Sequence, residues 1–506
     1  MVFSFCRSCL TQLRQAPRSV PSWPTALPRG PAFHTTAGRY ESPLTRKKTR
    51  AANARVDVPK YRVPSSAKMK KKKRPTERSR PPAFGERKAL RKRIVLSNPN
   101  ALEVEGMPEL TEQTMVDSRL RGTVVGLPVP MIDQLRAVQA FKPSQGWSIF
   151  RRPGTVMRRE TLEMGRLFDS ISGEGEGQGT VVKKVITGAR KSGKSVHLLQ
   201  AIAMGFTNKW VVITVPEAKE LVDATTSYAP LSEDSPLYVQ NEATAALLSR
   251  TITANGQVLR KLHVSLTHSV LPAAKPGMTL EDLAKIGVQD PASSWRVFQA
   301  LWAELTATSA APGLESHFTP RPPLLVTVDG LAHWMTETEY FGPDLKRIHA
   351  HDFVFVRHFL SLLKPGKDKA VLPNGGAIIY STSTSNNPHV YSFDIALKQV
   401  AARHAGVDPS TSEFPQPEPY SYVDSRVLEA LESTKPTVAK EGMLQVQTLG
   451  GLTRDEARGF LEYFARSGLL RESITDEWVS EKWTLAGGGL IGELERIGRR
   501  ARLPAA

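Results

Sequence analysis

The chain has 506 residues, 40% of them hydrophobic and 23% charged, so it offers material for about two to four domains and can bury a core. No apolar run approaches the roughly 18 residues of a membrane span, and the presence of only two cysteines excludes a secreted fold built on disulfides. The net charge of +19 is unevenly distributed: residues 1–93 carry +21 and the remainder −2, which predicts a nearly neutral body with one very basic arm.

Residues 1–40 have the composition of a mitochondrial targeting segment. They contain five arginines, several Ser and Thr residues and no acidic residue. Arg7 and Arg14 interrupt any apolar run long enough for a secretory signal. The stretch from Arg29 to Tyr40 resembles fungal matrix-processing sites. We therefore predict import into the mitochondrial matrix, with a merely disordered basic terminus as the alternative.

Residues 41–105 form a basic, proline-rich arm, in which residues 41–93 hold 20 Lys and Arg. Prolines keep such a segment extended, so we expect it to be disordered. Few aromatic residues are interleaved, which favours phosphate contact without sequence readout, and ribosomal RNA is the expected partner. A solvated tail, a nuclear-import signal and contact with nucleoid DNA are the alternatives. The residues expected to contact rRNA are Lys70, Lys71, Lys72, Lys73, Arg74, Arg87, Lys88, Arg91, Lys92 and Arg93.

One segment of the body has the spacing of a P-loop. The β-branched run 181–187 predicts a strand, and residues 196–204 predict a helix. The residues that connect the expected strand to the expected helix, together with the first residue of that helix, are the expected nucleotide-binding residues. They are Gly188, Ala189, Arg190, Lys191, Ser192, Gly193, Lys194, Ser195 and Val196. Glycines let backbone N–H groups surround phosphates at a helix N-terminus, Lys194 supplies charge at the β- and γ-phosphates, and Ser195 offers a hydroxyl to Mg²⁺. The pattern predicts nucleotide binding but does not distinguish guanine from adenine.

A P-loop requires an acidic residue at the end of a neighbouring buried strand. Residues 324–328 are apolar enough for such a strand, and Asp329 follows at the edge where ligands gather in open α/β sheets. We therefore predict Ser195 and Asp329 as the ligands of Mg²⁺. The next residue is Gly330, where ATPases of the AAA+ type usually carry a glutamate that activates water. Hydrolysis should consequently be slow or absent.

Three further strands are expected, at residues 210–215, 376–381 and 444–449, and the polar cluster 381–386 is expected to hold a γ-phosphate sensor. Thr453 and Glu456 form a capping box before an apolar helix face, and residues 490–497 predict a final helix. The predicted fold class is α/β, a P-loop NTPase of AAA+ type with a parallel five-stranded sheet and a helical C-terminal lid. We place the nucleotide-binding core at residues 106–440 and the last strand with the lid at 441–506.

Two weaker patterns do not change this interpretation. The alternating glycines of residues 173–179 precede a strand, so they predict a loop and not a dinucleotide fingerprint. His349, His351 and His358 suggest a metal only weakly, because helical residues two apart do not share a face and no cysteine accompanies them.

The chain resembles the death-associated protein 3 family of mitochondrial small-subunit ribosomal proteins. The resemblance covers about residues 107–500 and rests on the targeting segment, the P-loop and residues 210–222, 324–330 and 460–464. It implies an AAA+-like fold in the head of the small mitoribosomal subunit, near the large subunit. It also implies GTP or GDP as the cofactor, while the residues leave ATP open.

The predicted function is a structural component of the small mitoribosomal subunit with at most slow GTPase or ATPase activity. Its expected partners are small-subunit rRNA, other small-subunit proteins and the large subunit across an intersubunit bridge. Two alternatives remain open. One is an active AAA+ or signalling-type NTPase that remodels a matrix partner, and the other is a nucleoid DNA-binding protein.

Overall fold

The computed structural model describes residues 94–173, 179–232, 235–364, 371–382, 389–431, 443–470 and 472–500. The targeting segment and the residues expected to contact rRNA lie outside these ranges. Residues 94–105 pack onto the body: Leu96 and Ala101 are buried, and the Leu102 N–H donates to the Ser467 carbonyl at 3.1 Å. Residues 94–105, which composition assigns to the arm, therefore belong to the packed body.

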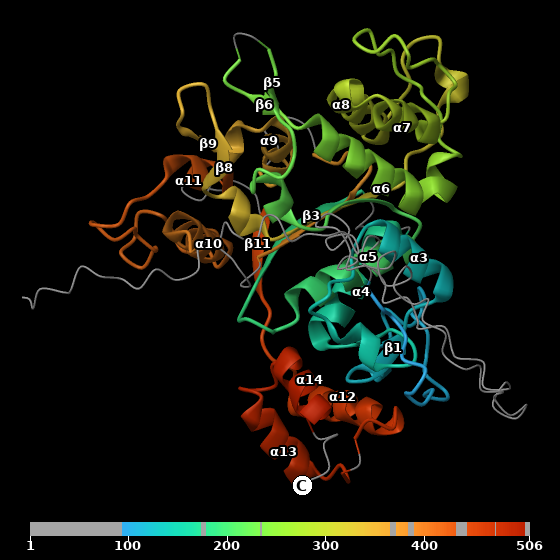
Figure 1. The fold of residues 1–506 in the computed structure, drawn as a ribbon, viewed down its shortest axis with the longest axis vertical. Coiled ribbons are helices and arrows are strands. Elements are labelled where there is room, and N and C mark those ends of the chain that lie inside the picture. Colours follow the sequence, from blue (N-terminus) through green and yellow to red (C-terminus); the bar gives the residue numbers. More distant parts are fainter. Residues whose placement is uncertain are drawn as a thin grey trace, which may run out of the picture. The chain divides into compact units, whose positions relative to one another are not determined.

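A parallel five-stranded sheet forms the centre of the described body, as predicted (Figure 1). Its spatial order is β11 (Leu444–Thr448), β3 (Val181–Thr187), β10 (Gly376–Ser381), β7 (Leu324–Asp329) and β4 (Val211–Val215). Strands β10, β7 and β4 are fully buried, which explains why they appear in the sequence as apolar runs and not as alternating patterns. Strand β10 separates β3 from β7 and pairs Ser381 with Ile186 on one side and Asp329 on the other.

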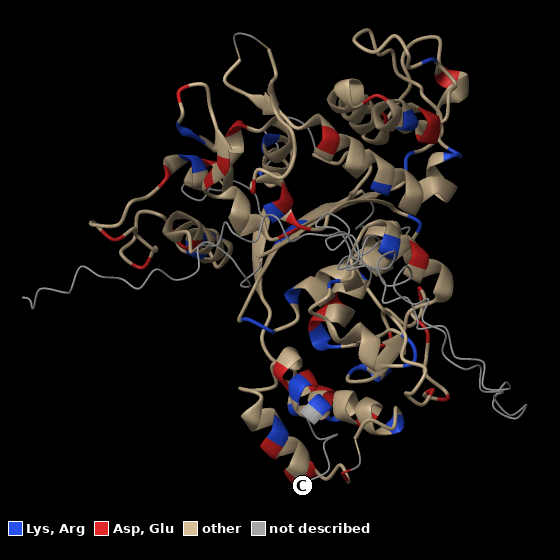
Figure 2. Cartoon of the chain, viewed as in Figure 1, with Lys and Arg blue, Asp and Glu red and all other residues tan. Residues whose placement is uncertain are grey.

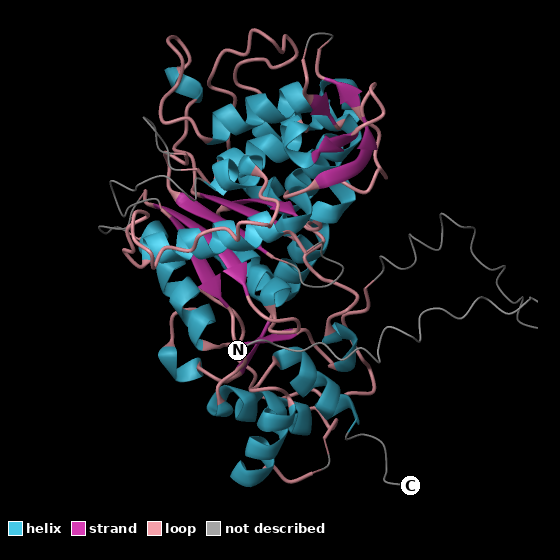
Figure 3. Ribbon diagram, turned by 90° about the vertical axis from the view of Figure 1, so that its left-hand side faces the viewer, coloured by secondary structure: helices cyan, strands magenta, loops and turns pink. Residues whose placement is uncertain are grey.

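Helices cover both faces of the sheet (Figure 3). Neighbouring residues of a strand point to opposite faces of the sheet. Ile186 therefore packs in one apolar cluster with a first set of helices, and Val185 packs in a second apolar cluster with the later helices. The first set is α3 (Val129–Ala137), α4 (Arg159–Ser172) and α5 (Lys194–Thr207). The later helices are α6 (Asn241–Leu259), α7 (Leu280–Gln289), α8 (Ser294–Leu305), α9 (Val354–Ser361), α10 (Tyr391–His404) and α11 (Ser425–Leu431).

Three two-stranded antiparallel ribbons accompany the sheet within the described residues. They are β1 (Val124–Gly126) with β2 (Gly154–Val156), β5 (Ala229–Pro230) with β6 (Tyr238–Val239), and β8 (Glu337–Phe341) with β9 (Arg347–His349). The β1–β2 ribbon is part of the packing of the C-terminal helices, because Val124 and Val156 belong to the same apolar cluster as Phe464.

The C-terminal helices are α12 (Arg454–Arg466), α13 (Asp476–Leu485) and α14 (Ile491–Arg500). The predicted capping box is present, with Thr453 and Glu456 bonded to each other's backbone N–H. Glu456 is 2% exposed and also accepts from Arg121 Nε at 3.0 Å and from the Arg159 N–H at 2.9 Å. Burial raises the pKa of Glu456, but the hydrogen bonds outweigh it, so that its pKa is lowered overall. This helix cap therefore also connects α12 to the start of α4.

Acidic and basic side chains are interspersed over the described body (Figure 2). This distribution agrees with the net charge near zero outside residues 1–93. Among the described helices, none has both the length and the apolar character to cross a membrane.

Candidate nucleotide-binding site

The predicted P-loop connects β3 to α5 at the carboxyl edge of the sheet. Strand β3 ends at Thr187 and α5 begins at Lys194, so the loop lies at the amino end of a 14-residue helix. Gly188 and Gly193 have φ values of +141° and +97°, in the region that favours glycine. A Cβ atom at Gly188 would lie 2.3 Å from the Leu449 carbonyl oxygen. The glycine spacing is thus required by the path of the backbone.

Lys194 directs its ammonium group back into this loop. The residue is 6% exposed, and Nζ donates to the carbonyl oxygens of Gly188 and Ala189, each at 2.8 Å. Burial lowers the pKa of Lys194, against the opposing effect of the Asp329 charge. The buried Ser192 hydroxyl has no hydrogen-bond partner among the described residues. A buried cation and an unpaired hydroxyl at a helix N-terminus fit the phosphates of a nucleotide.

Asp329 ends strand β7 and is bonded by two side chains. Ser381, at the end of β10, donates its hydroxyl to Asp329 Oδ1 at 2.5 Å, and Lys142 Nζ lies 3.0 Å from Oδ2. Asp329 and Ser195, the two expected magnesium ligands, line one small cavity together with Lys142. The fold therefore brings the predicted pair together and adds a lysine between α3 and β2.

The remaining P-loop residues lie at the tip or at the helix start. Ala189, Arg190 and Lys191 are exposed, whereas Val196 is half-buried in the first turn of α5. Lys191 Nζ pairs with Glu493 Oε1 at 2.7 Å, and the Gly492 N–H donates to the Lys191 carbonyl at 3.1 Å. The start of α14 consequently contacts the tip of the P-loop.

Sequence reasoning missed two residues of this site. Arg158 is buried, and its guanidinium donates to the carbonyls of Ser192 and Gly450, each at 3.2 Å, and pairs with Glu160. Lys142 reaches the end of β7 from the segment after α3. Neither residue belongs to a motif within its own segment, so no local signal was available to find it.

Gly330 has a conformation that suits glycine. Its φ is +89°, and its N–H donates to the Ser381 carbonyl at 2.9 Å. A residue with a side chain would be strained in this conformation. The backbone therefore disfavours a glutamate at position 330, and the sequence has none there. Of the expected γ-phosphate sensor cluster, Thr382 donates its hydroxyl to the Ile186 carbonyl at 3.2 Å. Residues 383–388 lie outside the described residues.

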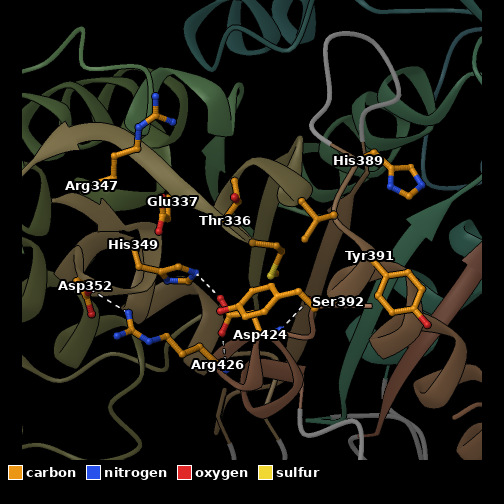
Figure 4. Close-up of a pocket in the computed structure, with 13 residues that line it drawn as sticks. Thr336, Glu337, Arg347, His349, Asp352, His389, Tyr391, Ser392, Asp424 and Arg426 are labelled. Carbon is orange, nitrogen blue, oxygen red and sulfur yellow. Dashed lines mark hydrogen bonds and ion pairs between the residues drawn. The ribbon is translucent and has the colours of Figure 1, made fainter. Parts of the chain in front are cut away.

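A second cavity, of about 490 Å³, lies beside β8, β9 and the first residues of α10 and α11 (Figure 4). On its walls Arg426 Nη1 pairs with Asp352 Oδ2 at 3.1 Å, and His349 Nε2 lies 3.2 Å from Asp424 Oδ2. Burial lowers the pKa of His349, which favours its neutral form. Burial lowers the pKa of the neighbouring His351 to about 3. Within the described ranges, no group of three His, Cys, Asp or Glu is arranged to hold a metal ion. We assign no ligand to this cavity, because Arg426 and Asp352 are paired with each other and Asp424 already contacts His349.

Comparisons with known proteins agree on one family. A profile of the family described as "Mitochondrial ribosomal death-associated protein 3" matches residues 155–497, which include the P-loop and Asp329. "Small ribosomal subunit protein mS29" of Neurospora crassa is 40% identical over 434 residues, 85% of each chain. A solved structure of the Aeropyrum pernix ORC2 protein (ADPNP–ADP complexes) aligns with 69% of this chain and 67% of that chain, at 14% identity and a TM-score of 0.28, and we draw no conclusion from it. The chain therefore belongs to the mitochondrial ribosomal death-associated protein 3 family, as the resemblance of its motifs predicted.

Proposed function

We propose that the chain is a structural component of the small mitoribosomal subunit, located in the head of that subunit in the mitochondrial matrix. Family membership and the small-subunit relative support this role. Its partners are then small-subunit rRNA, neighbouring small-subunit proteins and, across an intersubunit bridge, the large subunit. The basic residues of 70–74 and 87–93 bind rRNA through charge, with phosphates as the contacted groups.

We further propose that the P-loop binds a purine nucleotide, GTP or GDP with ATP as the alternative, as a part of the folded structure. The observation that carries this proposal is Lys194, a buried ammonium in a glycine loop at the amino end of α5. The strand order, with β10 between the P-loop strand and the Asp329 strand, agrees with an AAA+-type core. Gly330 supplies no general base, which favours stable binding over turnover and counts against an active remodelling NTPase.

Sedimentation of mitochondrial extract, with nucleotide analysis of the small-subunit fraction, tests both roles. We expect the protein to migrate with small subunits and to carry stoichiometric nucleotide, while subunits that contain a Lys194→Ala variant carry none. Migration as a free matrix protein would refute the structural role. Assembled wild-type subunits without nucleotide would refute the nucleotide role and leave the structural one.

A further inference from the structure

We infer that Lys142 takes the place of Mg²⁺ at this site, so that the chain binds its nucleotide without a divalent cation. The inference rests on the proposed nucleotide binding and deepens it. A positive charge is needed near Asp329, because its carboxylate and the nucleotide phosphates would otherwise repel each other. In most P-loop proteins Mg²⁺ supplies this charge.

The carboxylate of Asp329 already has a protein partner on each oxygen. Oδ1 accepts from the Ser381 hydroxyl at 2.5 Å, and Oδ2 lies 3.0 Å from Lys142 Nζ. Lys142 also donates to the Pro216 carbonyl, directly after β4, so its ammonium is held from two sides. The side chains of Asp329 and Lys142 are 6% and 22% exposed, which limits screening by solvent. The protein thus neutralises this carboxylate with its own cation.

The backbone that carries Lys142 is fixed as well. The Lys142 N–H donates to Gln145 Oε1 at 2.8 Å, and the preceding Phe141 packs edge-on against Trp147 with ring centroids 5.1 Å apart. Both aromatic rings are buried. Lys142 is therefore a positioned residue and not a mobile surface lysine.

Ser195, Lys142 and Asp329 share a small cavity whose other walls include Leu198, Leu199 and Ile202 of α5, and none of Gly188–Lys194 lines it. The cavity that Ser195, Lys142 and Asp329 line has a volume of about 10 Å³, which is close to the minimum that holds one water molecule. Mg²⁺ demands near-octahedral coordination at about 2.0–2.1 Å and usually keeps several waters. Ser381 and Lys142 occupy the two oxygens of Asp329, so Mg²⁺ binds this carboxylate only if one of them leaves it, and the arrangement does not fit the expected magnesium site.

Binding of fluorescent mant-GDP and mant-ADP to the purified chain, in excess EDTA and in millimolar MgCl₂, tests the inference. For the wild type we expect dissociation constants in the two conditions that agree within a factor of about three, which is well under one tenfold step. Lys142→Met should weaken binding in EDTA by about tenfold or more, the lower end of the effect of a hydrogen bond to a charged group. MgCl₂ should restore that loss. Lys261→Met, which removes an exposed lysine after α6, is the matched control and should behave as the wild type.

The outcomes separate the inference from the proposed function on which it rests. Wild-type binding that requires Mg²⁺, or a Lys142→Met variant with unaltered Mg²⁺ dependence, overturns the role of Lys142. Absence of binding in both conditions refutes the nucleotide proposal itself. If Lys142→Met fails to fold, the Mg²⁺ dependence of wild-type binding alone tests the role of Lys142. The second measurement is then the melting temperature of the wild type in EDTA and in MgCl₂, each with and without GDP.

Discussion

Replacement of Lys194 by alanine tests whether the nucleotide is part of the fold, and the structure divides its effect into two parts. Without nucleotide, the variant loses the hydrogen bonds from Nζ to the Gly188 and Ala189 carbonyls. A hydrogen bond from a charged group contributes about 1.5–3 kcal/mol, so the two bonds together contribute roughly 3 kcal/mol or more. The burial that lowers the pKa of Lys194 offsets part of it, because the alanine variant no longer desolvates an ammonium group. The nucleotide-free variant should therefore lose less stability than these two bonds contribute.

A second, separate effect should appear when nucleotide is present. A ligand at one hundred times its dissociation constant stabilises the folded form by about 2.7 kcal/mol. For the roughly 400 residues of the body, at about 2.1 cal/mol/K of unfolding entropy per residue, this corresponds to a rise of about 3 °C in melting temperature. Lys194→Ala should lose this rise, because the cation at the β- and γ-phosphates is gone.

Differential scanning calorimetry with and without GDP, GTP or ATP measures both parts, and sedimentation measures the fraction of variant protein in small subunits. Lys261→Ala, an exposed lysine remote in sequence from the P-loop, is the control and should keep the full rise. We expect the Lys194 variant to lose the ligand-induced rise and to assemble poorly. A retained rise, or normal assembly with an empty site, would refute the structural role of the nucleotide.

Deletion of residues 41–93 should flatten the salt dependence of ribosome association, whose slope of log affinity on log salt should be about −7 to −9 if roughly ten phosphates are neutralised; an unchanged slope would remove the rRNA contact. N-terminal sequencing of the mitochondrial form should start between about Phe33 and Ser42, and a mature protein that retains Cys6 would contradict the import prediction. Nucleotide turnover by the purified chain should stay below about 1 s⁻¹, because Gly330 offers no general base. Faster steady-state turnover would contradict this prediction and show that another group activates the attacking water. Burial lowers the pKa of His358 to about 4, below its unfolded value of 6.5, so the stability from its neutral imidazole is complete above pH 6.5 and is lost as pH falls through 6.5 towards 4. His358→Phe, next to Phe298 and Trp302, should reduce the loss of unfolding free energy between about pH 7.5 and pH 5 by on the order of 2 kcal/mol in denaturant titrations.

The sequence by itself was sufficient for features whose determinants are local. All five strands of the sheet were predicted. Strands β4, β7 and β10 are short, fully buried apolar runs, which need no knowledge of their neighbours. Strands β3 and β11 are only partly buried, and their β-branched or alternating residues were sufficient. The helix that begins at Lys194 and the Thr453–Glu456 capping box were predicted for the same reason, since each is defined by residue spacing within one segment. Helix α13 was missed, because Val479 is its only buried residue and no apolar periodicity marks it.

Only the tertiary structure decided which residues complete the site. From earlier segments, Arg158 reaches the P-loop and Lys142 reaches Asp329, and Glu456 bonds to Arg121 and Arg159 more than 290 positions away in the chain. Such contacts depend on strand order and on how helices cross the sheet, and neither property is written in the composition of a single segment. The sequence predicted a carboxylate at the end of β7, but the packing of the loop after α3 determined that a lysine pairs with it.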